Sequence, residues 1–123
     1  MPAQPDFTPV FEQLKTLLTP HQAALVVTAD SVTAYSLHTH KLGPNRKPFY
    51  FGGVVMNKNY VSLHLMAVYV HPELLTPLSD GLRRRMQGKS CFNFKQPLDA
   101  TQLDELRHLT AQGLAALQQD SLA

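Results

Sequence analysis

The chain has 123 residues, of which 44% are hydrophobic, and its eleven basic residues nearly balance its nine acidic ones. This size and composition predict one folded domain with a single core, and they exclude a mainly disordered chain. The net charge of +2 lacks the strong basic bias that is typical of nucleic-acid-binding proteins, so we expect no nucleic-acid partner.

The cysteine content and the distribution of apolar residues bear on location. Cys91 is the only cysteine and has no partner for an internal disulfide, which is typical of a reducing compartment. The N-terminal stretch MPAQPDFTP has no signal-peptide pattern, and no run approaches the roughly 18 apolar residues of a membrane span. These features predict a cytoplasmic protein without a membrane segment.

The first part of the chain predicts a helix followed by two strands. Thr8 is expected to be the N-cap of the helix, Pro9 occupies its first position, and Pro20 ends it. Apolar residues at helical spacing support the helix, and short β-branched runs support the strands. The expected elements are a loose segment at 1–8, a helix at 9–19, strands at 24–29 and 32–39, and a loop at 41–48.

Two apolar runs flank Asn57-Lys58-Asn59 and predict a β-hairpin. A three-residue loop keeps the apolar side chains on one face, whereas a two-residue loop would mix the faces. The expected cross-strand pairs are Met56 with Tyr60, Val54 with Ser62, and Gly52 with His64. The expected core face carries Phe49, Phe51, Val55, Val61, Leu63, Leu65 and Ala67. The opposite face carries Tyr50, Gly52, Met56, Tyr60, Ser62, His64 and Met66.

The remainder of the chain predicts two helices that flank a short strand. Pro77 falls inside the first of these helices and either kinks it or splits it into two. The order α-β-β-β-β-α-β-α, with short turns between consecutive strands, predicts an α+β fold in which helices pack on one face of a mainly antiparallel sheet. The expected boundaries are a helix at 72–85, a strand at 91–95, a helix at 101–118, a single domain at 9–119 and a tail at 120–123.

The run RRRMQGKSCFNFK, residues 83–95, contains a Gly-Lys-Ser triplet. A phosphate-binding P-loop needs a glycine where this chain has Arg83, and it needs a strand before the loop and a helix after it. The expected order here is the reverse, so we predict no nucleotide loop. Instead, Gly88 is expected to end the helix in a left-handed conformation, with Arg83, Arg84 and Arg85 near the negative helix end.

Cys91 alternates with Phe92, so it shares the outward face of its strand with Asn93 and Lys95. Two interpretations of the thiol stay open. It is either a small, inert side chain or a nucleophile whose pKa is lowered by Lys89 and the neighbouring arginines.

Three histidines are candidates for a functional role. His38 and His40 point the same way from one strand, and His64 is the third potential ligand that a metal site would need. No carboxylate motif accompanies them, so we favour plain surface histidines at a strand end. His64 lies mid-strand opposite Gly52, which leaves room above the sheet and predicts an aromatic, polar surface there.

The segments FYFGGVVMNKNYVSLHLMAVY (49–69) and LRRRMQGKSCFNFK (82–95) resemble those of the bacterial YdhG-like domain family, a group of unknown function. The resemblance covers nearly the whole chain. It implies a small single-domain α+β protein and supplies no catalytic residues.

Some members of this family are described as frataxin-like iron chaperones, which implies iron binding. Frataxins bind iron through an acidic ridge, because hard cations prefer oxygen ligands. The first helix of this chain offers only Glu12, with Asp6 just outside and Lys15 opposing. The resemblance therefore supports the fold more than an iron role.

These patterns lead to three functional hypotheses. The first is a non-catalytic module that binds a small molecule or a protein partner through Tyr60, His64, Met66, Lys89, Ser90, Cys91 and Asn93. The alternative is frataxin-like iron binding and delivery through His38, His40 and His64 or scattered carboxylates. A second alternative is an enzyme that uses Cys91 or His64. We predict no catalytic residue, metal ligand or cofactor, and a homodimer through the outer sheet face or an edge strand is compatible with exposed sheet edges.

Overall fold

The computed structural model describes residues 6–42 and 47–120. The predicted loop at 41–48 therefore lies partly outside the described residues, as do most of the predicted N-terminal segment and C-terminal tail. The helices are α1 (Thr8–Leu18), α2 (Ala67–Val70), α3 (Asp80–Arg83) and α4 (Ala100–Gln119), with the short 3₁₀ helices η1 (Thr19–Ala24) and η2 (Pro72–Leu75). The strands are β1 (Val26–Asp30), β2 (Ala34–Leu42), β3 (Pro48–Met56), β4 (Val61–Leu65), β5 (Met86–Gln87) and β6 (Cys91–Phe94).

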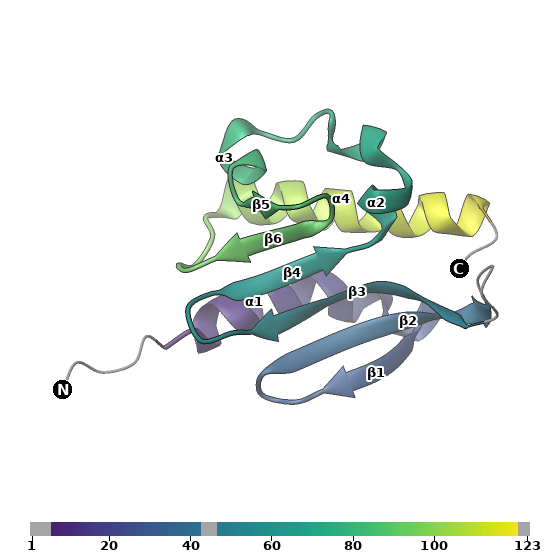
Figure 1. Cartoon of the computed structure of the whole chain (residues 1–123), viewed down its shortest axis with the longest axis horizontal. Coiled ribbons are helices and arrows are strands. Elements are labelled where there is room, and N and C mark those ends of the chain that lie inside the picture. Colours follow the sequence, from purple (N-terminus) through teal and green to yellow (C-terminus); the bar gives the residue numbers. More distant parts are fainter. Residues whose placement is uncertain (1–5, 43–46, 121–123) are drawn as a thin grey trace.

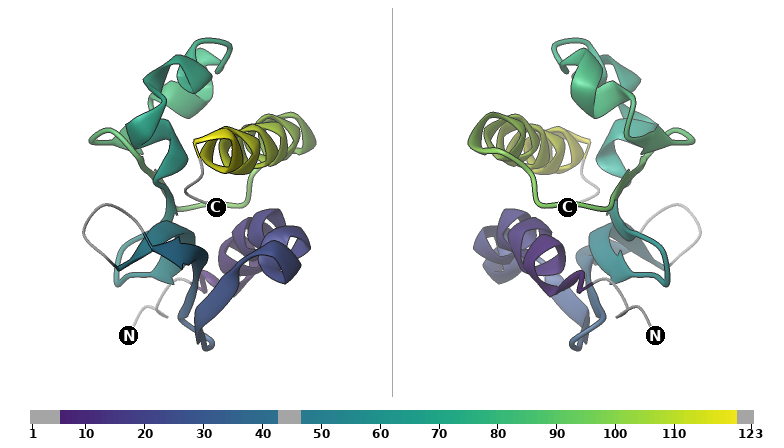
Figure 2. Two further views of the ribbon diagram at one scale, coloured as in Figure 1. Left: turned by 90° about the vertical axis from the view of Figure 1, so that its right-hand side faces the viewer. Right: turned by 90° about the vertical axis from the view of Figure 1, so that its left-hand side faces the viewer.

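The strands form one six-stranded sheet in the order β1-β2-β3-β4-β6-β5, and all neighbouring strands are antiparallel. Figure 1 looks onto one face of this sheet, with α1 and α4 behind it. The side views in Figure 2 place both helices on the same side of the sheet. The predicted α+β fold, an antiparallel sheet with helices on one face, is confirmed.

Helix α1 supplies much of the core between the helices and the sheet. At its start, Asp6 Oδ1 accepts the backbone N–H of Thr8 at 3.0 Å, and Pro9 stands in the first turn. Thr8 is thus the first helical residue and not the N-cap that we predicted. Its apolar stripe is buried as expected from the helical spacing: Val10, Phe11, Leu14, Leu17 and Leu18.

Helix α4 begins at a capping box. Asp99 Oδ1 accepts the backbone N–H of Gln102 at 2.8 Å, and Gln102 Oε1 accepts the backbone N–H of Asp99 at 3.4 Å, so two exposed donors of the first turn are satisfied. Farther along, Gly113 lets α4 approach α2, because a Cβ there would lie 2.8 Å from the Cβ of Ala67. Among the described helices, none combines the length and the apolar character needed to cross a bilayer.

The continuous helix predicted at 72–85 is wrong, and the split that Pro77 allowed is what occurs. Within the predicted range the chain forms η2 before Pro77 and α3 after it, because proline lacks the N–H of a helical hydrogen bond and its ring clashes with the preceding turn. The short helix α2 precedes this range. After α3, Met86 and Gln87 pair with Phe92 and Cys91 as strand β5, which we did not predict.

Arg83 and Gly88 do not close the end of a long helix as expected. The Arg83 guanidinium donates to the carbonyl oxygens of Leu75 at 2.7 Å and Thr76 at 2.9 Å, so it holds the end of η2. Gly88 has the expected left-handed conformation, with a φ of +77°, but it lies in the turn between β5 and β6.

The register of the β3–β4 hairpin is shifted by one residue from the predicted one. Met56 pairs with Val61, Val54 with Leu63, and Gly52 with Leu65, so the loop spans 57–60. Our three-residue loop was therefore wrong.

A bulge in β3 explains why the predicted faces were partly wrong. The pairing of β3 with β2 shifts between Tyr50 and Gly52. A bulge inserts one extra residue and changes which side chains face the core beyond it. Phe51 stays buried, but Val54 replaces Val55 as the core residue, and Met56 packs against the core.

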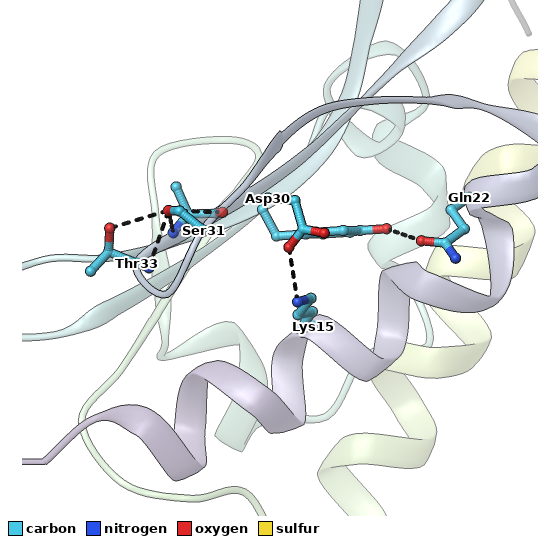
Figure 3. A network of polar contacts seen from close by, with 7 residues as sticks. Lys15, Gln22, Asp30, Ser31 and Thr33 are labelled. Carbon is cyan, nitrogen blue, oxygen red and sulfur yellow. Dashed lines mark hydrogen bonds and ion pairs between the residues drawn. The ribbon is translucent and has the colours of Figure 1, made fainter.

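The β1–β2 hairpin is fastened to α1 by a small polar network (Figure 3). Lys15 Nζ lies 3.1 Å from Asp30 Oδ1 and 5.2 Å from the centre of the Tyr35 ring. The Tyr35 hydroxyl donates to Gln22 Oε1 at 2.8 Å. These contacts join the edge strand to the helical layer and belong to the fold, because they lie on the helix-covered side of the sheet.

Candidate functional site

The sheet face that α1 and α4 leave uncovered, called the outer face below, carries the polar side chains of the central strands. His64 on β4 pairs with Gly53 on one side and with Cys91 on the other. One row along, Ser62 lies between Val55 and Asn93. His64 and Cys91 are therefore cross-strand neighbours.

A directed chain of hydrogen bonds crosses this face. Asn57 Nδ2 donates to Ser62 Oγ at 3.1 Å, and the Ser62 hydroxyl then donates to Asn93 Oδ1 at 2.8 Å. The Cys91 thiol also donates to Asn93 Oδ1, at 3.4 Å. Ser62 is only 4% exposed, so the centre of this chain is shielded from water. Ser62 and Cys91 thereby fix the orientation of the Asn93 amide, and Asn57 in the hairpin loop holds Ser62 in place.

The orientation of the Asn93 amide has a chemical consequence. Its oxygen already accepts two hydrogen bonds, whereas within residues 6–42 and 47–120 its nitrogen has no hydrogen-bond partner. No buried side-chain nitrogen or oxygen of the described residues lacks a partner, so the Asn93 nitrogen is in contact with solvent. Asn93 therefore presents two N–H donors from a fixed position.

Tyr50 covers the next part of the outer face. A Cβ on Gly53 would lie 2.6 Å from the Tyr50 hydroxyl oxygen, so the phenol occupies the space that the glycine leaves. Burial raises the pKa of Tyr50 to about 12, and the nearby Cys91 contributes to the same shift. The Tyr50 ring also contacts His38, with 5.1 Å between the ring centres. Tyr50 is consequently a neutral phenol at neutral pH.

Cys91 and His64 are both held in their uncharged forms. Burial raises the pKa of the Cys91 thiol, and Ser62 only partly offsets this effect. Burial lowers the pKa of the His64 imidazole. Within residues 6–42 and 47–120, the side chains of Cys91 and His64 form no hydrogen bond with each other. A neutral thiol beside a neutral imidazole is the opposite of an activated Cys–His pair, which needs a thiolate.

Alkylation measures the state of Cys91 directly. We expect iodoacetamide to modify the native protein more slowly than a free thiol at neutral pH, with the rate rising only at pH values above the ordinary cysteine titration. The same protein unfolded in urea is the matched control, because Cys91 is its only cysteine. A native rate equal to or above the unfolded rate would contradict the neutral, inert thiol.

A cavity of about 300 Å³ opens where the outer face meets strand β5. Three cationic side chains contribute to its wall, and the backbone N–H of Asn93 donates to the carbonyl oxygen of Arg85 at 2.8 Å, which brings β5 beside β6. We call this cavity the cationic cleft. Its polar lining consists of Tyr60, Arg84, Arg85, Gln87, Asn93 and Lys95.

A second hollow lies at the opposite end of β4 and has a different character. It measures about 560 Å³ and is lined by side chains that include Val68, Tyr69, Leu75 and Lys89. The Lys89 Nζ atom lies 5.9 Å from the centre of the Tyr69 ring. Nearby, the Ser90 hydroxyl donates to the Met66 sulfur at 3.5 Å.

The structure divides the predicted ligand-binding residues into three places. His64 and Cys91 lie at the centre of the outer face, Tyr60 and Asn93 line the cationic cleft, and Lys89 lies with Ser90 and Met66 at the other end. Sequence reasoning did not name as site residues Tyr50, Asn57, Ser62, Arg84, Arg85, Gln87 and Lys95. The predicted outer-face position of Tyr60 and the alternation through Cys91, Asn93 and Lys95 were the signals that led toward the cleft.

The histidines that were considered as metal ligands are not brought together. His38 lies on β2 and His64 on β4, with β3 between them. In the part of the chain that the structure describes, no group of three or more histidine, cysteine, aspartate or glutamate side chains could hold a metal ion.

Comparisons with family models, with curated proteins and with solved structures found no match to this chain. The resemblance to the YdhG-like family accordingly stays a prediction.

Proposed function

We propose that this chain is a small-molecule-binding module whose ligand lies on the outer face between His64 and the cationic cleft. The observation that carries the proposal is the hydrogen-bond chain that fixes the Asn93 amide and leaves its N–H donors exposed. Binding sites commonly combine an apolar or aromatic wall with a few fixed polar groups. Tyr50 and His64 supply such a wall here, because both are half-buried on a face without helices.

The uncharged states of the side chains support binding over catalysis. Cys91 carries a raised pKa and His64 a lowered one, so neither is prepared as a nucleophile or as an acid at neutral pH. Their polar atoms instead offer weak donors and acceptors to a bound molecule. This arrangement favours recognition of a polar, partly aromatic ligand.

A fragment screen followed by amide chemical shifts tests this proposal. Fragments that bind are expected to change the amide chemical shifts of Gly53, His64 and Cys91. The substitution His64→Gln is expected to weaken the binding of these fragments. His108→Gln is the matched control, because His108 is an exposed histidine on α4. Fragments that bind only in the hollow beside Tyr69 would overturn the proposal. A dimer in sedimentation experiments whose formation protects the outer-face amides from hydrogen exchange would also overturn it.

A further inference from the structure

We infer that the cationic cleft binds the phosphoryl group of a small phosphorylated ligand. This inference rests on the proposed function and deepens it, because the cleft is continuous with the outer face through Asn93. It is unrelated to the Gly-Lys-Ser triplet, since Lys89 lines the other hollow.

The charge of the cleft is not neutralised from within. Arg84, Arg85 and Lys95 all line it, and no aspartate or glutamate does. Within residues 6–42 and 47–120, none of these three side chains forms an ion pair. Three like charges around a concave surface concentrate a positive potential and attract anions.

The acidic side chains at the start of α4 are engaged elsewhere. Asp99 accepts the backbone N–H of Gln102 as the helix cap. Asp104 pairs with Arg107 at 2.6 Å. Glu105 accepts both the backbone N–H and the hydroxyl of Ser79, each at 2.9 Å. These carboxylates therefore stabilise α4 and the α3 region and leave the positive charge of the cleft uncompensated.

The neutral lining adds hydrogen-bond donors, and the Asn93 amide has a fixed direction. Asn93 contributes its N–H groups, because Ser62 and Cys91 occupy its oxygen. Gln87 pairs with Cys91 across β5 and β6, so it lies beside the row of Cys91 and His64. Arginine suits bidentate recognition of phosphate, and a lysine adds a point charge.

The number of charges selects the ligand class. A single carboxylate would leave most of the positive charge of the three cations unpaired, whereas a phosphate or pyrophosphate group carries about two or more negative charges near neutral pH. A cavity of about 300 Å³ is at the small end of ligand sites, so it fits one such group and not a long polymer. The remainder of the ligand would then extend toward Tyr50 and His64.

Calorimetric titration with inorganic pyrophosphate at low ionic strength tests the inference. We expect one pyrophosphate per chain, and the double variant Arg85→Gln/Lys95→Gln should weaken the affinity by at least about tenfold, since hydrogen bonds to charged groups are lost. Asn93→Asp should weaken binding comparably, because it introduces a negative charge at the fixed amide. All three side chains lie at the surface of the cleft, and circular dichroism will verify that each variant is folded.

Lys89→Gln is the matched control for the single variant Arg85→Gln, because each removes one positive charge and Lys89 lies at the opposite end of β4. Equal weakening by Lys89→Gln and by Arg85→Gln would overturn the inference in favour of general charge attraction. Citrate binding as tightly as pyrophosphate would overturn the phosphoryl class, and a single-stranded oligonucleotide binding more tightly through the same residues would overturn the small-molecule class. If pyrophosphate does not bind while fragments still change the chemical shifts of the outer-face amides, the phosphoryl inference is wrong and the proposed binding function is retained.

Discussion

Replacing Gly52 with alanine is expected to lower the free energy of unfolding by about 1–3 kcal/mol, which is the usual range for overpacking a core. Gly52 lies on β3 opposite Leu65, and an added Cβ would contact the carbonyl oxygen of His64 on the neighbouring strand. Backbone cannot move aside as a flexible side chain can, so the strands would have to separate. Urea unfolding followed by circular dichroism will measure the loss.

Gly81→Ala is the matched control for this substitution. The nearest heavy atom to a Cβ at Gly81 is Gln102 Nε2 at 3.8 Å, which is an ordinary contact. Alanine there should be neutral or should stabilise the protein by up to about 1 kcal/mol, because it reduces the freedom of the unfolded chain. If Gly52→Ala proved as stable as Gly81→Ala, the close approach of β3 and β4 at the bulge would be wrong.

Phe92→Ala is expected to lower the free energy of unfolding by about 3–5 kcal/mol, the range for removing a buried phenylalanine. Phe92 is fully buried, and it pairs with Leu63 on β4 and with Met86 on β5. The substitution leaves a cavity under the edge of the sheet. Because β5 has only two residues, its pairing depends on this packing, and we expect it to detach first.

The detachment of β5 can be separated from global unfolding. Amide hydrogen exchange in the Phe92→Ala variant should speed up in β5 more than in β2 and β3. Tyr69→Ala is the control, because it removes an aromatic side chain that is 55% exposed and should change stability by less than about 0.5 kcal/mol. A loss for Phe92→Ala no larger than this control would contradict the burial.

The packing of Phe92 also affects the proposed ligand site. Phe92 packs inward from β6, while its neighbours Cys91 and Asn93 face outward. Detachment of β5 would carry Arg85 away from Asn93, since the two residues are joined by a backbone hydrogen bond. A Phe92→Ala variant that remains folded should therefore bind pyrophosphate less tightly even though no cleft residue has changed.

Local pattern in the sequence determined the two long helices, α1 and α4, and the inward face of β6. The apolar spacing in 9–19 and 101–118 predicted α1 and α4 closely, because a helix of that length buries one stripe and shows it in the residue order. The alternation through 91–95 correctly placed Cys91 and Asn93 on the face opposite Phe92. The α+β class followed from the order of these elements.

The tertiary structure alone decided the register and the assembly of the candidate site. The bulge at Tyr50–Gly52 arises from pairing with β2, and the two-residue strand β5 exists only because β6 lies beside it. The β5–β6 hairpin is short, but it forms on β6 only because β6 pairs with β4, which joins Ser62 to Asn93, 31 positions away, and no local pattern encodes that pairing. The cationic cleft depends on the pairing of β5 with β6, because that pairing brings Arg85 beside Asn93. The sequence by itself therefore determined the two long helices and the outward side chains of β6, whereas strand pairing decided the faces of β3 and which residues become neighbours.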